Sequence, residues 1–382
     1  MSQALSPVAF LQDLIAFKTI SGTSNTPMIE YLEAWARQNG FDYERIRHPK
    51  DPGRTNLLCW IGPMKGGGLM LSGHTDVVPV VGQSWQSDPF ILREKDSKLY
   101  GRGTADMKGF IAALCCGLSS FNFKRLSKPL SLLFTYDEEI GCKGSALCGP
   151  LIKNILPVMP EAALIGEPTD FTILRMHSGH LTLKIVAKGK GAHSSDPDLG
   201  TSAIKAMHQV LSKLFSLEHE LKNEISLADF FPRPYVTLNV GVINGGSAVN
   251  IIPDEAFILV GLRPLPNYPI QEIISRINLV THSVSKESGA QVSLESGDLA
   301  PAMITKANTK LEQILLPHAK PSKIIAAAFT TDAGNLNQEG IECLIFGPGS
   351  INIAHQANEF INKEALEQAT EKIPQIVEKY LT

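Results

Sequence analysis

Residues 69–76 read LMLSGHTD, a short apolar run that ends in a polar cluster. The same arrangement recurs in LSLLFTYDEEIG at residues 130–141 and in AALIGEP at residues 162–168. Between the first two runs, TADMKGFIAALCCGL at residues 104–118 has the length and apolar content of a helix. Short apolar strands that alternate with helices predict an α/β domain with a largely parallel sheet.

A different pattern follows residue 178. Residues 181–187 (LTLKIVA), 236–242 (VTLNVGV) and 256–262 (AFILVGL) alternate between inward and outward positions, as half-buried strands do. An amphipathic helix separates the first two of these strands. This order of elements predicts a second domain of the α+β class.

The chain is long enough for two domains, because its 382 residues exceed the size at which one hydrophobic core usually stops growing. We therefore predict a two-domain α/β fold. A mostly parallel sheet belongs to residues 1–178 and 298–382, and residues 179–297 form an inserted α+β domain.

Two helices are expected before the first strand. Ser6 is placed to cap one of them, and Pro7 suits its first helical position because its ring fixes a helical φ. Apolar residues at positions 10, 11, 14 and 15 then share one stripe. The second helix has apolar residues at positions 28, 29, 32 and 35, which is helical spacing, and stops at Gly40.

Composition excludes several classes of partner. The formal net charge is −3, with 43% hydrophobic and 19% charged residues, so nothing favours nucleic acid or an anionic membrane as a ligand. The N-terminal segment lacks the basic start of a signal peptide. The six cysteines show no metal or disulfide spacing, and reduced thiols in a cytoplasmic protein are expected.

Acidic and imidazole side chains stand where the predicted strands end, which is where open α/β sheets place their sites. His74 and Asp76 are two residues apart and face the same side of an extended segment. The Asp76 carboxylate could then accept the second ring N–H of His74 and fix its tautomer. A surface turn is the plain alternative for this pair.

Five more positions extend the pattern: Asp106 at the start of a helix, Glu138 and Glu139 after the second strand, Glu167 after the third and His355 after a fourth. Asp106 could equally cap its helix, and the two glutamates could lie in a solvated loop. Adjacent carboxylates nevertheless repel each other unless a cation lies between them.

The combination is more specific than any one of its members. Two histidines and several carboxylates, each just past a strand end, suit a pair of divalent cations such as zinc or cobalt. Three carboxylate ligands and one bridging hydroxide balance the charge of two such cations. One carboxylate then remains free to act as a base.

Seven motifs occur in a fixed order along nearly the whole chain: HTDVVP, GRGTADMKG, DEEIG, GEP, GAHSS, NIIPD and AHQANEF. In this order they resemble the family of acetylornithine deacetylases, succinyl-diaminopimelate desuccinylases, aminoacylases and carboxypeptidase G. Seven motifs in register are far more specific than one.

The resemblance implies a role for each residue at the strand ends. Glu138 would be the general base, Asp76 would orient His74, and the peptide bond after Asp106 would be cis. The resemblance also implies two metal ions, zinc or cobalt, with Asp106 bridging them: His74 and Glu167 bind one, and Glu139 and His355 bind the other.

For the inserted domain, the resemblance implies dimerisation. His193 in GAHSS looks like the family's oxyanion-stabilising histidine, which one subunit of a homodimer lends to the active site of the other. Asn250 and Arg263 resemble substrate-contacting positions, although Arg263 could equally form a structural salt bridge. Two departures from the family pattern, Ser178 and Gly261, bear on substrate details.

Within the family, the segment from LSGHTDVVPVV to GRGTADMKGFIAA looks closest to acetylornithine deacetylases. The expected reaction is hydrolysis of N2-acetyl-L-ornithine to ornithine and acetate, a step of arginine biosynthesis. Succinyl-diaminopimelate, other N-acyl amino acids and dipeptides are the alternatives as substrates. A non-catalytic binding relative is disfavoured because every metal and base position is filled.

Overall fold

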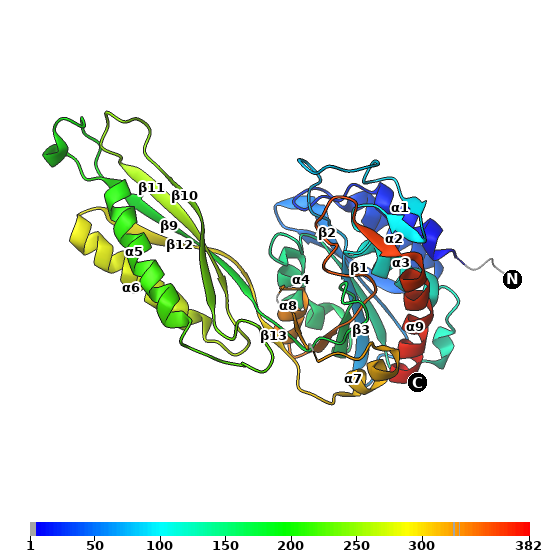
Figure 1. Ribbon diagram of the computed structural model, residues 1–382. Helices are drawn as coiled ribbons and strands as arrows, with labels where there is room; N and C mark the ends of the chain where they lie inside the picture. The colour runs from blue at the N-terminus through cyan, green and yellow to red at the C-terminus, as the bar shows by residue number, and fades with distance from the viewer. Residues whose placement is uncertain (1–4, 324, 328) are drawn as a thin grey trace. The chain divides into compact units, whose positions relative to one another are not determined.

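The computed structural model describes residues 5–323, 325–327 and 329–382, so the first four residues of the N-terminal segment lie outside it (Figure 1). The chain divides into two compact units. Unit 1 comprises Met1–Met176, Met303–Ala327 and Thr331–Thr382, and unit 2 comprises His177–Ala302 with Ala328–Thr330.

The large sheet of unit 1 has the strand order β1-β2-β6-β3-β7-β15. Strands β6, β3, β7 and β15 are parallel neighbours, whereas β1 and β2 join the edge in antiparallel pairs. The predicted mostly parallel sheet is confirmed. Its strands are β1 (Asp42–His48), β2 (Asp51–Ile61), β3 (Gly68–His74), β6 (Leu130–Thr135), β7 (Pro160–Ile165) and β15 (Glu342–Ile345).

Helices cover both faces of this sheet (Figure 1). On one face, alternate apolar side chains of β2 and β6 join a single core with four helices, because successive strand residues point to opposite faces. These helices are α1 (Pro7–Ala16), α2 (Thr26–Gln38), α3 (Lys108–Leu118) and α9 (Lys363–Leu381). The helices α4 (Lys143–Ile155) and α8 (Ala333–Gln338) lie on the other face, and α7 (Lys310–Leu315) packs against α9.

The two expected N-terminal helices are both present. The Ser6 hydroxyl accepts the N–H of Ala9 at 3.4 Å, and α1 begins at Pro7 as predicted. The apolar stripe of α1 is buried. Helix α2 ends at Gln38, and the chain then turns through Gly40, whose φ of +80° favours glycine.

Shorter elements complete the fold. Two three-stranded sheets have the orders β16-β5-β4 and β13-β8-β14. Their strands are β4 (Arg93–Lys95), β5 (Lys98–Tyr100), β16 (Phe360–Asn362), β8 (Met176–His177), β13 (Met303–Ile304) and β14 (Ala326–Ala327). Among the described residues, the short 3₁₀ helices are η1 (Phe123–Arg125), η2 (Pro197–Leu199) and η3 (Leu316–His318).

Unit 2 is an antiparallel sheet with two helices on one face (Figure 1). The sheet order is β10-β11-β9-β12, and the helices and sheet enclose a hydrophobic core of their own. The three predicted strands are present, and β12 is an additional one. The elements are β9 (His180–Lys188), α5 (Ala203–Leu221), β10 (Thr237–Gly245), β11 (Glu255–Arg263), α6 (Ile270–Ser288) and β12 (Gln291–Ala300).

Two further features of the structure bear on the expectations from composition. All six cysteines are buried and free of disulfides. In the part of the chain that the structure describes, no helix combines the length and the apolar character needed to cross a bilayer.

Candidate metal centre

The topology of the large sheet brings the predicted strand-end residues together. Strands β6, β3 and β7 are adjacent and parallel, so their carboxyl ends lie at the same edge. His74 is the last residue of β3, Glu138 and Glu139 follow β6, and Glu167 follows β7. Asp106 reaches the same edge from the loop before α3.

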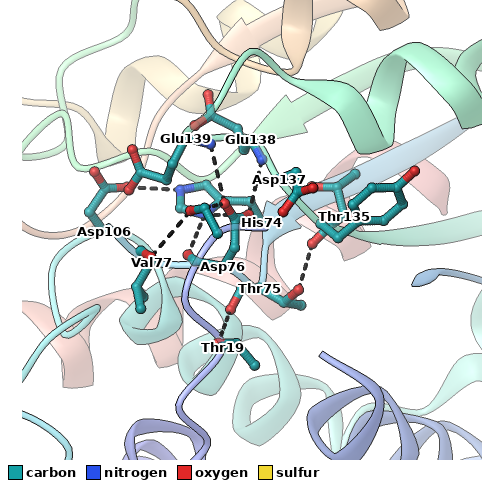
Figure 2. Close-up of polar contacts among 12 residues, drawn as sticks. Thr19, His74, Thr75, Asp76, Val77, Asp106, Thr135, Asp137, Glu138 and Glu139 are labelled. Atoms are coloured by element: carbon teal, nitrogen blue, oxygen red, sulfur yellow. Dashed lines mark hydrogen bonds and ion pairs between the residues drawn. The ribbon is translucent and has the colours of Figure 1, made fainter. Parts of the chain in front are cut away.

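Asp106 lies between two imidazoles. Its Oδ1 is 2.9 Å from Nε2 of His74, and its Oδ2 is 3.3 Å from Nε2 of His355. Glu139 Oε2 is 2.8 Å from the same nitrogen of His355. One ligand atom each from His74, Asp106 and Glu139 can be chosen within 4.8 Å of one another, a spacing that suits a bound cation (Figure 2). The two oxygens of the Asp106 carboxylate thus face different histidines, Oδ1 toward His74 and Oδ2 toward His355.

The backbone carbonyl of Asp76 fixes the orientation of His74, because that carbonyl lies 2.9 Å from Nδ1 and can only accept a hydrogen bond. Nδ1 therefore carries a proton, and the neutral ring offers the lone pair of Nε2 toward Asp106. Two acceptors, the ring nitrogen and a carboxylate oxygen, cannot face each other at 2.9 Å without a cation or a proton. The geometry therefore fits a divalent cation at this position.

The predicted acceptor for His74 needs correction. The Asp76 carboxylate lies 3.6 Å from Nδ1, beyond a hydrogen bond. It instead accepts the backbone N–H groups of Glu138 and Glu139 at 3.0 and 3.3 Å, and the hydroxyl of Ser21 at 2.7 Å. These donors are preferred because the segment after β6 would otherwise carry unsatisfied buried N–H groups. Asp76 thus positions both His74 and the two glutamates.

Three glutamates are buried close together. Burial, with the charge of Glu167, raises the pKa of Glu138 well above its ordinary value, and burial with the charge of Asp106 raises that of Glu139 to about 7. Burial and the charge of Asp106 also raise the pKa of Glu167. Its buried Oε1 has no hydrogen-bond partner among the described residues. Carboxylates crowded in this way need a positive charge to remain ionised.

The pKa values of two histidines are raised as well, but by the neighbouring carboxylates and against the effect of burial. Burial opposes protonation of His74, but the hydrogen bond to Asp106 and the charges of Glu138 and Glu167 raise its pKa well above the ordinary value. Contacts with Asp106 and Glu139 raise the pKa of His355 to about 10. The site therefore attracts positive charge from either protons or cations, and the donor set of imidazole and carboxylate fits two cations of the zinc type.

Buried carboxylates that the sequence analysis missed support the centre. Glu359 accepts the N–H groups of Ala105 and Asp106 at 2.9 and 3.1 Å and pairs with Arg102 at 2.7 Å. It thereby holds the loop that presents Asp106, and the peptide bond from Asp106 to Met107 is cis, as expected. Glu359 stands four residues after His355 in the AHQANEF motif, and its place in that motif could have identified it as a residue of the site.

A second missed carboxylate is Asp332, which is 2% exposed and accepts hydroxyl groups at both ends of the glutamate segment. It follows Thr330 and Thr331 in TTDAG, a polar cluster that could have been identified as a strand end.

The other three predicted site residues belong to unit 2. His193 and Asn250 are exposed and lie on adjoining segments, since His193 forms a β-bridge with Ile251 and Ser194 N donates to Asn250 O at 3.0 Å. Arg263 ends β11 and donates from Nη1 to Thr330 Oγ1 at 2.9 Å. Arg263 also lines a cavity of about 100 Å³. The catalytic and substrate-binding roles of these three residues remain proposals.

A model of peptidase family M20/M25/M40 matches residues 70–379. The chain belongs to this family. An acetylornithine deacetylase from Proteus mirabilis is 34% identical over 380 residues, which are 98% of this chain and 96% of the relative. These matches confirm the resemblance found in the motifs.

Solved structures of the family share the fold. A metallo-carboxypeptidase, Sso-CP2 of Sulfolobus solfataricus, superposes with a TM-score of 0.79 at 19% identity, covering 98% of this chain and 99% of that one. The YXEP protein of Bacillus subtilis, described as a dinuclear metal binding peptidase, superposes with a TM-score of 0.70 at 16% identity, with 98% and 97% coverage. Family and named relatives together make this chain a hydrolase that acts on amide bonds.

Proposed function

We propose that the enzyme removes the acetyl group of N2-acetyl-L-ornithine, producing ornithine and acetate for arginine biosynthesis. The observation that carries the proposal is the position of Asp106, with one carboxylate oxygen on each of two imidazoles. Full-length similarity to an acetylornithine deacetylase supports the choice of substrate. Six buried free thiols support a cytoplasmic enzyme.

In this proposal two divalent cations, zinc or cobalt, bind at the centre. His74 and Glu167 would hold one cation, Glu139 and His355 would hold the other, and Asp106 would be a ligand of both. The description of a relative as a dinuclear metal binding peptidase supports this number. Bound there, the cations would lower the pKa of a water molecule toward ~7 and polarise the scissile carbonyl.

Glu138 is proposed as the general base. Asp76 accepts the backbone N–H of Glu138, and burial together with the charge of Glu167 raises the pKa of the Glu138 carboxyl, which favours its uptake of a proton. Glu138 takes the proton of the attacking water and later delivers it to the nitrogen of the leaving amine. One carboxyl group thus serves as base and then as acid.

Unit 2 is proposed to complete the site in a homodimer. His193, lent by the partner subunit, would donate a hydrogen bond to the oxyanion of the tetrahedral intermediate. Arg263 would bind the substrate carboxylate with its planar guanidinium, and Asn250 would contact the same substrate. The domain assignment of residues 179–297 to dimerisation is part of this proposal.

The test is a hydrolysis assay on enzyme stripped with a chelator and reloaded with zinc or cobalt. Acetylornithine, succinyl-diaminopimelate, other acyl amino acids and dipeptides are compared by kcat/KM. We expect stripped enzyme to be inactive, activity to return with the metal, and acetylornithine to be hydrolysed fastest. A higher kcat/KM for succinyl-diaminopimelate or a dipeptide would replace the proposed substrate, and full activity without metal would remove the proposed mechanism.

A further inference from the structure

Asp332 lies directly before α8, but it does not cap that helix. Aspartate in this place usually accepts an N–H of the first helical turn. Here the side chain makes no such bond, although it is only 2% exposed. A buried carboxylate without a local partner costs free energy unless donors from elsewhere in the fold satisfy it.

Two hydroxyl groups supply those donors. Thr135 Oγ1 donates to Oδ2 of Asp332 at 2.5 Å, and Ser145 Oγ donates to Oδ1 at 2.5 Å. Both donors are fully buried. Hydrogen bonds from hydroxyl groups to an ionised carboxylate are short and about twice as strong as neutral ones.

The positions of the two donors give these bonds a consequence for the centre. Thr135 is the last residue of β6, and Ser145 lies in the first turn of α4. The segment between them carries Glu138 and Glu139. One carboxylate, from the residue before α8, therefore bonds to both ends of the segment that presents the proposed base and a proposed metal ligand.

Asp332 acts together with other contacts of this segment. At the strand end, the Thr135 carbonyl also accepts the N–H and the hydroxyl of Thr75 at 2.8 and 2.6 Å. The middle of the segment is held separately by Asp76, which accepts the N–H groups of Glu138 and Glu139. At the helical end, Asn335 of α8 donates to Ser145 Oγ at 2.9 Å, so the Ser145 hydroxyl accepts from Asn335 while it donates to Asp332. Asp332, just before α8, and Asn335, within it, thus both contact the helical end of the segment.

We propose that Asp332 is a positioning residue for amide hydrolysis, which acts by fixing both ends of the segment that carries Glu138 and Glu139. The inference rests on the proposed roles of those two glutamates. A shift of about 1 Å in a catalytic group can cost roughly 10²-fold in rate. Residues that position metal ligands typically contribute about 10–100-fold in metal affinity or activity.

The first variant is Asp332→Asn, which keeps the shape of the side chain but removes its charge and one acceptor. With metal at saturation, we expect kcat to fall about 10–100-fold while KM stays within about twofold, because the proposed substrate contacts, Asn250 and Arg263, do not belong to this segment. Zinc affinity, measured by competition with a chromophoric chelator, should weaken about tenfold through Glu139. That measurement does not depend on the substrate, so it separates failure of this inference from failure of the proposed function.

A matched pair at Thr135 tests the hydrogen bond itself. Thr135→Val keeps the volume and the β-branched shape but loses the hydroxyl, whereas Thr135→Ser keeps the hydroxyl and loses a methyl group. We expect Thr135→Val to repeat the loss seen in Asp332→Asn, with little further loss in the double variant, and Thr135→Ser to stay near wild type.

Glu33→Gln is the control for stability, because Glu33 is a buried ion-paired acid of α2 that does not contact the centre. It should lower the melting temperature without changing kcat or zinc affinity. Wild-type kcat and zinc affinity in folded Asp332→Asn would overturn the inference. Equal losses in Thr135→Ser and Thr135→Val would overturn it as well, because they would assign the effect to packing.

Discussion

Glu138 and Glu139 are neighbours in the chain but have different contacts. Glu139 Oε2 lies 2.8 Å from Nε2 of His355. Glu138 Oε1 instead accepts a hydrogen bond from Sγ of Cys142 at 3.6 Å. If Glu138 is the base, Glu138→Gln should lower kcat by roughly 10²–10⁴-fold. Metal content, measured by elemental analysis, should remain nearly intact, while Glu139→Gln should lose metal. Loss of metal from Glu138→Gln instead would exchange the roles of the two residues.

His177 gives a prediction for pH. It is fully buried, its Nδ1 donates to Ser178 O at 2.9 Å, and burial lowers its pKa to about 4. The unfolded chain therefore binds more protons than the folded chain between pH ~6.5 and ~4. Stability is fully present above that window and should fall by roughly 3 kcal/mol as the pH is lowered through it.

The check on His177 is urea unfolding at several pH values, in wild type and in His177→Asn. Asparagine keeps a donor for the carbonyl of Ser178 but does not titrate. The difference between the two free energies of unfolding should change with pH in the predicted window. If both proteins lose stability in parallel, other groups account for the acid sensitivity.

The element that presents Asp106 depends on an ion pair between distant segments. Arg102 and Glu359 are both 1% exposed in their side chains and lie 2.7 Å apart. Glu359→Gln would leave the guanidinium without its counter-charge, and we expect the free energy of unfolding to fall by about 3 kcal/mol. Glu161→Gln is the matched control, since the Glu161–Lys128 pair is exposed and should contribute less than about 1 kcal/mol. If the free energy of unfolding falls no more in Glu359→Gln than in the control Glu161→Gln, the buried pair is not required.

At the scale of the whole molecule, the proposal requires two subunits for each active site. His193→Ala and Glu138→Gln should each be inactive alone. A mixed dimer would contain one site with an intact base and an intact partner histidine. With random exchange at equal concentrations, about a quarter of wild-type activity should return, because half of the dimers are mixed and each has one complete site of two.

The complementation assay needs a measure of exchange, such as subunits that carry different affinity tags. If tagged mixed dimers form and activity stays absent, His193 acts within its own chain or has no role in catalysis.

Much of the fold could be predicted because its signals are local. Helix α1 begins at Pro7 and buries the expected stripe, since capping and helical periodicity depend on near neighbours in the chain. The strand runs before His74, Glu138 and Glu167 are buried parallel strands, and this topology brings those residues to one edge. Their position at the ends of parallel strands therefore predicted that these three residues gather at the candidate centre.

The tertiary structure decided which atoms contact one another. Asp76 stands next to His74 in the sequence, yet its carboxylate binds the N–H groups of the glutamate segment, and its carbonyl faces the imidazole. Thr135 and Asp332 are separated by 197 residues, and Asp106 and Glu359 by 253. No local pattern encodes such pairs, because a buried carboxylate takes its donors from whichever elements pack against it.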